Sequence, residues 1–174
     1  MSPTTIPVER LVIVPFDDIP PSVVQALADD LAALGIEVSV DAPVPMLESA
    51  YRSGRGQYHA GILLDLLSGR GAPHVLGITR RDLFADRLNF VFGVAARWGG
   101  ACLISVARLT HGADDAIFRA RMLKEAVHEL GHTLGLAHCP NPLCVMHFSN
   151  SLDDTDRKSE AYCDRCVALL AARA

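Results

Sequence analysis

The sequence lacks any cluster of lysine and arginine residues, although 16 of its 174 residues carry these side chains. Domains that bind nucleic acids usually carry a basic patch on one face, and the net charge here is −4. Long apolar runs are also absent, because none approaches the roughly 20 residues that a helix needs to span a bilayer. We therefore expect no nucleic-acid partner and no membrane span or membrane partner.

Internal repeats and low-complexity segments are absent as well, and half of the residues are hydrophobic. A chain of this length can bury about two-thirds of its unfolded surface around one core. We expect a single domain over residues 1–174 that acts as a monomer. Within it we expect a sheet-and-helix part over 8–138 and a cysteine-rich part over 139–174.

The first residues, MSPTTIPVERLVIVPF, have no basic segment before their apolar run and no small-residue cleavage site after it. A secretory signal peptide carries both features, so we interpret this stretch as a first strand and expect a cytoplasmic protein. Thiols stay reduced in the cytosol. Four of the five cysteines lie between positions 139 and 166, and in a reducing compartment such clustering favours a metal site over disulfides.

Hydrophobic periodicity predicts strands that alternate with helices in the first half of the chain. Strands are predicted at 10–16, 36–40, 75–83, 89–97 and 98–109, and helices at about 20–35, 56–69, 114–136 and 164–173, with a loop at 41–56. Alternation favours a parallel sheet with crossover helices, and a glycine pair at 99 and 100 favours a hairpin between the last two strands. The predicted fold class is α/β (α+β), with a mixed, mostly parallel sheet and an antiparallel edge strand.

His128 and His132 lie four residues apart on the predicted long helix, within the sequence HELGHTLGLAH. Side chains at this spacing share one face of a helix, so two neutral imidazoles can chelate a single Zn²⁺. Glu129 projects beside them, where it could accept a proton from a water that the metal activates. The pattern therefore predicts a metal site with its own base.

Gly135 predicts how a third histidine reaches the same metal. A continuing helix would carry His138 to a different face, whereas a glycine can adopt a positive φ, end the helix and let the chain bend back. Three histidine ligands (His128, His132 and His138) leave a fourth position open for water. That arrangement is typical of a catalytic zinc site rather than a structural one.

Cys139, Cys144, Cys163 and Cys166 form a second set of candidate ligands. The last two make a C-x-x-C pair, which can grip one metal from a tight turn, and the first two complete a Cys₄ set. Four soft thiolates with no open position fit a structural zinc. A redox role for the C-x-x-C pair is the alternative, although no thioredoxin-like strand–helix–strand context surrounds it. Cys102 lies in an apolar strand pattern and is expected in the core.

The string H-E-x-x-H-x-x-G-x-x-H over 128–138, followed by Met146, resembles the metzincin class of zinc metallopeptidases. In that class a turn containing a methionine forms an apolar floor beneath the metal, so the resemblance implies this role for Met146. With the four cysteines added, the pattern is similar to that of the archaemetzincins, a metzincin family with a second, all-cysteine zinc site.

Four further segments look like that family's N-terminal part: RGQYHAGILL (55–64), LGITRRDLF (76–84), NFVFGVA (89–95) and ISVARL (104–109). The resemblance therefore covers most of residues 8–168. One departure is visible, because 16 residues separate Met146 from Cys163 where the family pattern has 17. The resemblance implies a metzincin-like zincin fold with a long active-site helix and a small, irregular, zinc-stapled C-terminal subdomain. It also implies that an edge strand aligns the peptide substrate, and we predict residues 98–109 for this strand.

These observations predict a zinc metallopeptidase with two Zn²⁺ per chain, one catalytic and one structural, and with peptide or protein substrates. Zinc at the histidines would polarise the scissile carbonyl, and Glu129 would act first as general base and then as general acid. Two alternatives remain. One is a zinc protein whose cleft binds peptides or partner proteins without cleaving them. The other is a zinc-ribbon-like interaction module, which leaves the histidines without a role.

Overall fold

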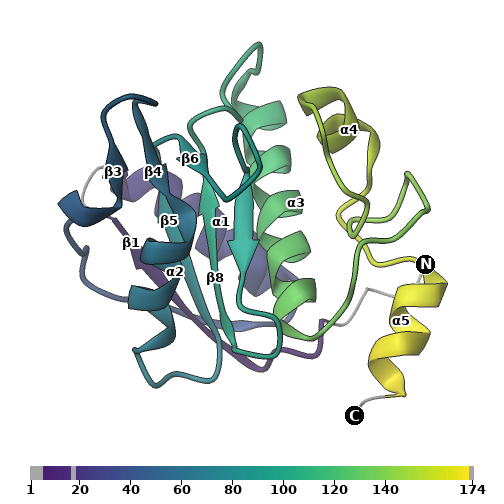
Figure 1. The fold of residues 1–174 in the computed structure, drawn as a ribbon. Helices are drawn as coiled ribbons and strands as arrows, with labels where there is room; N and C mark the ends of the chain where they lie inside the picture. Colours follow the sequence, from purple (N-terminus) through teal and green to yellow (C-terminus); the bar gives the residue numbers. More distant parts are fainter. Residues whose placement is uncertain (1–5, 17–18, 173–174) are drawn as a thin grey trace.

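A computed structural model describes residues 6–16 and 19–172 of the chain (Figure 1). The strands are β1 (Arg10–Pro15), β2 (Glu37–Val40), β3 (Tyr51–Arg52), β4 (Gln57–His59), β5 (Val75–Thr79), β6 (Leu83–Phe84), β7 (Gly93–Ala95) and β8 (Ala101–Ser105). The helices are α1 (Pro21–Ala33), the 3₁₀ helix η1 (Glu48–Ala50), α2 (Ala60–Ser68), α3 (Asp115–Thr133), α4 (Leu152–Arg157) and α5 (Asp164–Ala171). Among the described residues, no helix combines the length and apolar character needed to cross a membrane.

Five strands form the main sheet in the order β2-β1-β5-β8-β7. β1 runs parallel to β2 and β5, and β5 runs parallel to β8, whereas β7 runs antiparallel to β8. Parallel neighbours need long crossover connections, and the helices α1 and α2 lie within two of them. The predicted mixed, mostly parallel sheet with an antiparallel edge strand is therefore confirmed.

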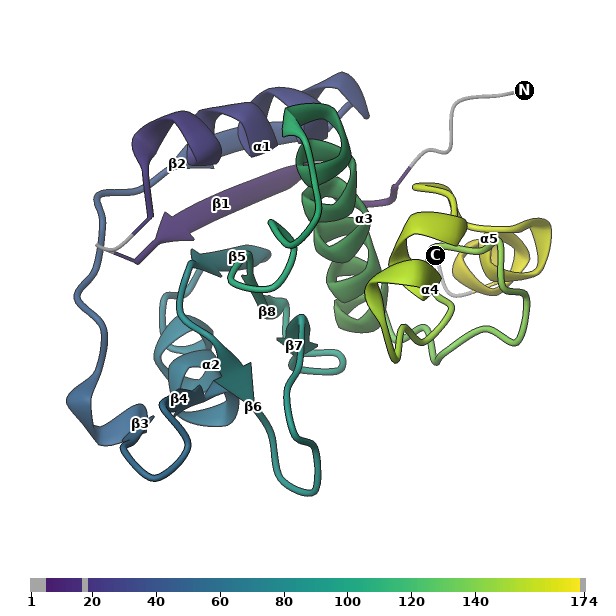
Figure 2. The ribbon, with the colours of Figure 1, turned by 90° about the horizontal axis from the view of Figure 1, so that it is seen from above.

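Helices cover both faces of this sheet. α1 and α3 lie on one face and contact each other, while α2 lies on the other face (Figures 1 and 2). Each face has its own buried cluster, with Leu27, Ile104 and Leu130 in the first and Phe16, Leu63 and Leu103 in the second. The long helix α3 crosses next to β8 and β7, and it carries the histidine motif to the sheet edge.

The prediction that residues 98–109 form the edge strand is wrong. Their ordered part, β8, lies between β5 and β7 and is buried at every residue, whereas β7 forms the antiparallel edge. The residues of β8, ACLIS, are almost uniformly apolar, which is typical of a strand with neighbours on both sides and helices on both faces. The edge strand therefore comes from the preceding predicted strand, at 89–97.

Smaller differences involve short elements. The predicted helix at 56–69 begins with strand β4 and becomes helical only at Ala60, and the predicted loop at 41–56 contains η1 and β3. β3, β4 and β6 form a second, three-stranded sheet. Helix α4 was not predicted. Elements of two to six residues carry too few periodic positions for a sequence pattern to identify them.

Candidate active site and cysteine cluster

Three imidazole rings meet near the C-terminal end of α3. His128 and His132 come from the helix, and His138 comes from the segment that follows it. One nitrogen from each ring lies within 4.8 Å of those from the other two, and the Nε2 atoms of the two helical histidines are 3.1 Å apart. Burial lowers the pKa of all three rings, to about 4 for His138. The rings are therefore neutral at pH 7.

Hydrogen bonds to backbone carbonyls decide which nitrogen of each helical ring carries the proton. Nδ1 of His128 donates to the carbonyl of Val145 at 2.7 Å, and Nδ1 of His132 donates to the carbonyl of Leu136 at 2.7 Å. A neutral imidazole has a single N–H, so both Nε2 atoms present lone pairs toward each other. Lone pairs at this separation repel unless a cation lies between them, so the arrangement fits a metal ion held by the Nε2 atoms.

The turn after α3 brings the third histidine back to the helix. Gly135 has a φ of 85°, and its N–H donates to the carbonyl of His132 at 2.9 Å. The N–H of Leu136 donates to the carbonyl of Gly131 at 2.9 Å. This pair of bonds is the Schellman arrangement, which needs a left-handed residue and therefore favours glycine. The chain reverses at this point, so His138 faces the two helical rings.

Glu129 lies beside this cluster and is only 4% exposed. Burial and the nearby carboxylate of Glu125 raise the pKa of Glu129 well above its ordinary value, and the Lys158 ammonium partly opposes this. A raised pKa suits a group that accepts a proton and later donates it. Glu129 packs against Gly93 of β7, where an added Cβ would lie 2.6 Å from Cγ and Oε1 of Glu129. A glycine therefore lets the edge strand approach the carboxylate.

Met146 is fully buried against the turn of α3 that carries the histidines. Gly131, between the two helical histidines, leaves room for it, because a Cβ on this glycine would overlap the Met146 sulfur. Tyr162 packs on the same glycine, and its hydroxyl donates to the carbonyl of Val127 at 3.0 Å. A thioether and an aromatic ring thus form an apolar layer against this turn of α3.

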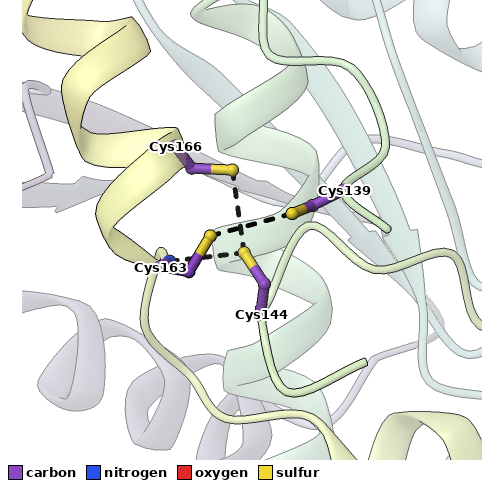
Figure 3. A group of neighbouring side chains, drawn as sticks. All are labelled: Cys139, Cys144, Cys163 and Cys166. Atoms are coloured by element: carbon purple, nitrogen blue, oxygen red, sulfur yellow. Dashed lines mark hydrogen bonds between the residues drawn. The ribbon is translucent and has the colours of Figure 1, made fainter. Parts of the chain in front are cut away.

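Four cysteine side chains point toward a common centre (Figure 3). Cys139 and Cys144 come from the segment after α3, and Cys163 and Cys166 come from the start of α5. The four Sγ atoms lie within 4.8 Å of one another, and two pairs, 139 with 163 and 144 with 166, are 3.7 Å apart. All four thiols are free. Zn–S bonds of about 2.3 Å in a tetrahedron would separate the sulfurs by roughly 3.8 Å, so the spacing fits one metal ion.

Local donors favour the thiolate form of Cys163, whereas burial raises the pKa of Cys144 and of Cys166. Burial by itself would raise the pKa of Cys163, but hydrogen bonds from the backbone of Cys166 and from the neighbouring thiols lower it to about 7. The backbone N–H of Cys163 donates to Sγ of Cys144 at 3.3 Å. The thiolate is the form of cysteine that binds metals, so these contacts suit a ligand set.

One short backbone segment connects the two clusters. The N–H of Cys139 donates to the carbonyl of Met146 at 2.9 Å, and Nδ1 of His147 donates to the carbonyl of Cys139 at 3.0 Å. The neighbouring carbonyl of Val145 is the acceptor that orients His128. Residues 139–147 therefore position candidate ligands of both clusters at once.

A cavity of about 430 Å³ opens over the histidines. It is lined by β7 and the residues before it, by α3, and by residues 148–150. Aromatic and aliphatic side chains supply most of its walls, and Glu125, Glu129, Ser149 and Asn150 are polar groups in its lining. Such a cavity next to the histidines and a buried carboxylate is where a substrate would bind.

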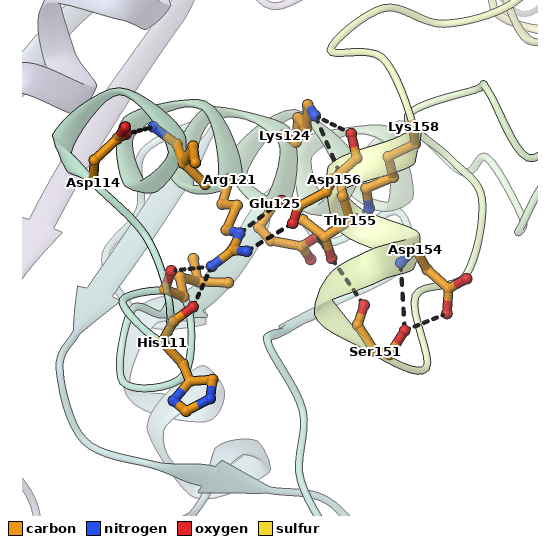
Figure 4. A network of polar contacts seen from close by, with 12 residues as sticks. His111, Asp114, Arg121, Lys124, Glu125, Ser151, Asp154, Thr155, Asp156 and Lys158 are labelled. Atoms are coloured by element: carbon orange, nitrogen blue, oxygen red, sulfur yellow. Dashed lines mark hydrogen bonds and ion pairs between the residues drawn. The ribbon is translucent and has the colours of Figure 1, made fainter.

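Sequence patterns missed several residues of this site. Lys158 is fully buried, and its Nζ lies 2.9 Å from Oε1 of Glu125. Arg121 donates to both carboxylate oxygens of Asp156 at 2.7 Å, and Figure 4 shows these groups linking α3 to α4 and the chain after it. Charged residues in a polar stretch carry no periodic signal. For Gly93 a weak signal existed, since a glycine inside a strand pattern indicates close approach of another group.

Cys102, which was predicted in the core, is fully buried on β8. Burial raises its pKa well above the ordinary thiol value, and the charge of Glu129 acts in the same direction. A thiol in this state is a poor ligand and a poor nucleophile. The core prediction for Cys102 is confirmed.

Comparison with known proteins gives consistent matches over most of the chain. The profile of peptidase family M54 matches residues 39–172. The archaemetzincin of Pyrococcus furiosus is 39% identical over an alignment of 180 residues, gaps included, which covers 95% of this chain and 94% of that protein. The archaemetzincin of Methanopyrus kandleri is 51% identical over 125 residues, or 71% of each chain. The crystal structure of archaemetzincin from Methanopyrus kandleri superposes with a TM-score of 0.84 at 44% identity, covering 95% of this chain and 94% of that one.

Proposed function

Because the chain belongs to peptidase family M54, the archaemetzincin family of zinc metallopeptidases, we propose that His128, His132 and His138 hold its catalytic zinc. The enzyme is a hydrolase that acts on peptide or protein substrates. The observation that carries the assignment is the pair of Nε2 atoms 3.1 Å apart, both left without a proton by the Nδ1 bonds. Tetrahedral Zn–N bonds of about 2.0–2.1 Å would separate two ligand nitrogens by roughly 3.3 Å, so the geometry supports zinc.

We propose that Glu129 moves the proton in peptide hydrolysis. Zinc held by the histidines would act as a Lewis acid toward the scissile carbonyl and the attacking water. Glu129 accepts a proton from that water, whose oxygen bonds to the carbonyl carbon. It then delivers the proton to the leaving nitrogen as the C–N bond breaks. The buried position of Glu129 and its raised pKa favour this second, acidic step.

We propose that the substrate backbone lies in an extended conformation along β7. Within the described part of the chain, β7 pairs with β8 on one side and with no named strand on the other. An edge of this kind can take a further strand through main-chain hydrogen bonds. β7 also lines the cavity over the histidines, and Gly93 touches Glu129. A peptide on this edge would therefore pass directly over the proposed reacting groups.

We propose that the cysteine cluster holds a second zinc, with a structural role. All four positions of a tetrahedron are taken by thiols, so no place remains for water or substrate. The Sγ separations of 3.7 Å support this. Free thiols suit a reducing compartment, so we also propose that the protein acts in the cytoplasm.

We propose that residues 1–174 form one monomeric domain, with parts at 8–138 and 139–174. Buried residues of the C-terminal part, among them Val145, Tyr162 and Leu170, belong to the same hydrophobic cluster as residues of α1 and α3. A shared cluster supports one cooperative unit. Light scattering during gel filtration measures the mass of the particle, and a dimer mass would contradict the monomer.

Metal analysis and peptide turnover on the purified protein test the proposal. We expect two zinc ions per chain, and we expect Glu129→Gln to keep both while losing cleavage of a peptide library. Glu37→Gln is the matched control, because Glu37 lies on β2, at the opposite edge of the sheet from β7. Full turnover by Glu129→Gln would remove this residue from the mechanism.

A second variant tests the histidine site by itself. His132→Ala should lose one zinc, keep the other and remain folded, because the four cysteines are untouched. Circular dichroism and metal content measure this together. Unfolding of the variant would show that the histidine site is structural.

A further inference from the structure

The walls of the cavity are aromatic on two sides. Phe90 and Phe92 stand edge to face with ring centroids 5.2 Å apart, and Phe148 packs against the ring of His138 at 4.8 Å. All three phenylalanines line the cavity. Aromatic rings pack favourably in edge-to-face and offset arrangements. An aromatic substrate side chain therefore fits these walls better than a short aliphatic one.

A buried carboxylate interrupts this apolar lining. Glu125 lines the cavity, and its Oε1 is held by Nζ of Lys158 at 2.9 Å and by the hydroxyl of Thr155 at 3.4 Å. The other oxygen of Glu125 makes no hydrogen bond to any of the described residues. Figure 4 shows Lys158 and Thr155 reaching Glu125 from α4 and the chain after it. The carboxylate is thus fixed by one oxygen and can accept a hydrogen bond from a ligand through the other.

A serine hydroxyl that lacks a hydrogen-bond partner belongs to the same cavity. Oγ of Ser149 is buried, yet it forms no hydrogen bond within residues 6–16 and 19–172. Ser149 lines the same cavity as Glu125. Buried polar groups nearly always have a partner, so this hydroxyl indicates a ligand or water that bonds here.

The charge of the pair limits what the ligand can be. Lys158 is 0% exposed and already neutralises Glu125. A substrate lysine or arginine would add a second cation beside this balanced pair, and burying a further charge there is costly. A neutral hydrogen-bond donor at the end of an aromatic ring therefore suits these walls better than a cation does.

We infer that the cavity selects a tyrosine side chain of the substrate over phenylalanine, with Glu125 and Ser149 as the specificity-determining residues and Lys158 as the positioning residue for Glu125. The inference rests on the proposed peptidase function. The ring packs against the phenylalanines, and the phenol donates to Glu125 or bonds to Ser149. Phenylalanine fills the same space but leaves the buried polar groups without a partner, which is how sites that bond a hydroxyl reject the analogue lacking it.

Two acetylated peptides that differ by one oxygen atom test this: Ala-Ala-Tyr-Ala-Ala and Ala-Ala-Phe-Ala-Ala. We expect wild-type kcat/KM to favour the tyrosine peptide by at least about tenfold, since a hydrogen bond to a charged group contributes that much or more. Calorimetric binding of both peptides to zinc-loaded Glu129→Gln measures the same preference without turnover. Equal affinities and equal kcat/KM for the two peptides would overturn the inference and leave the peptidase function standing.

Variants of the lining residues test which side chains produce the preference for tyrosine. Ser149→Ala should reduce the ratio of tyrosine to phenylalanine cleavage several-fold, while Ser68→Ala, on the opposite face of the sheet, should leave it unchanged. Glu125→Leu combined with Lys158→Met removes both charges together, because one buried charge left alone would destabilise the fold. We expect this double variant to lose most of the preference for the tyrosine peptide, with the remainder due to Ser149.

The outcomes distinguish a failure of the tyrosine preference from a failure of the peptidase function. If zinc-loaded wild type cleaves no library peptide, the proposed function fails, and the ratio of binding affinities for the two peptides still tests the tyrosine preference. If the double variant does not fold, the Ser149→Ala variant tests that preference instead. An unchanged ratio in Ser149→Ala, with normal phenylalanine cleavage, refutes the role of that hydroxyl.

Discussion

Gly93→Ala is expected to inactivate the enzyme without removing its metals. The added Cβ would lie 2.6 Å from Cγ and Oε1 of Glu129 and 2.8 Å from its Cδ. An ordinary contact needs 3.4 Å or more, so either the carboxylate or the edge strand must move by roughly 1 Å. A displacement of this size in a reacting group lowers the rate on the order of 100-fold, or about 2.7 kcal/mol in the barrier.

The assay compares kcat/KM on a cleaved peptide with zinc content and with the free energy of unfolding. Zinc content should stay at the wild-type level, because the three atoms nearest to the new Cβ all belong to Glu129. Gly54→Ala is the matched control, since a Cβ there meets nothing within 4 Å. Replacing a glycine without strain changes stability by about 1 kcal/mol or less. Wild-type activity in folded Gly93→Ala would refute the reasoning that this contact positions the base.

Two further predictions concern the cysteine cluster and the ion pair between Asp82 and Arg108. Cys163→Ser with Cys166→Ser should weaken zinc binding at the histidines by about 10- to 100-fold, because the segment carrying Val145 is held by the cysteine site; unchanged affinity in a chelator competition would show that the two sites are independent. Asp82→Asn tests pH dependence. Burial acts to raise the pKa of Asp82, but hydrogen bonds from Arg108 and a glutamine outweigh it and keep this pKa below 3.8. The ionised Asp82 therefore stabilises the fold fully at pH values well above 3.8, and this contribution is lost as the pH falls through the lowered pKa. The difference in unfolding free energy between wild type and Asp82→Asn should shrink in acid. Urea titrations at several pH values measure this difference, and a constant value would contradict the ion pair.

Local patterns in the sequence were enough to predict the long helix and its ending. The spacing of apolar residues identified α3, and Gly135 identified the turn that follows it. The strand–helix alternation likewise predicted the parallel sheet, because each element depends mostly on its own residues. The same holds for the candidate ligands, because three histidines and four cysteines at short spacings can be recognised in the sequence before the fold is known.

The position of each strand in the sheet could not be predicted in this way. β7 and β8 were both predicted as strands, but which of them forms the edge depends on what pairs with their outer sides. Strand order is a property of contacts between distant segments. Only the greater burial of β8 distinguishes the two, and a short apolar pattern reports burial weakly.

By itself, the sequence determined the candidate chemistry of this protein: the histidines and cysteines that could bind metal, the glutamate proposed as the base and the helix that presents them. Tertiary structure alone decided how that chemistry is enclosed. It brought Gly93 against Glu129, placed Lys158 beside Glu125 and left the Ser149 hydroxyl unpaired in an aromatic cavity. The physical reason is the separation along the chain between the residues that interact. Spacing along one helix follows from its 3.6-residue turn, whereas contacts across 30 or more residues arise only when the whole core packs.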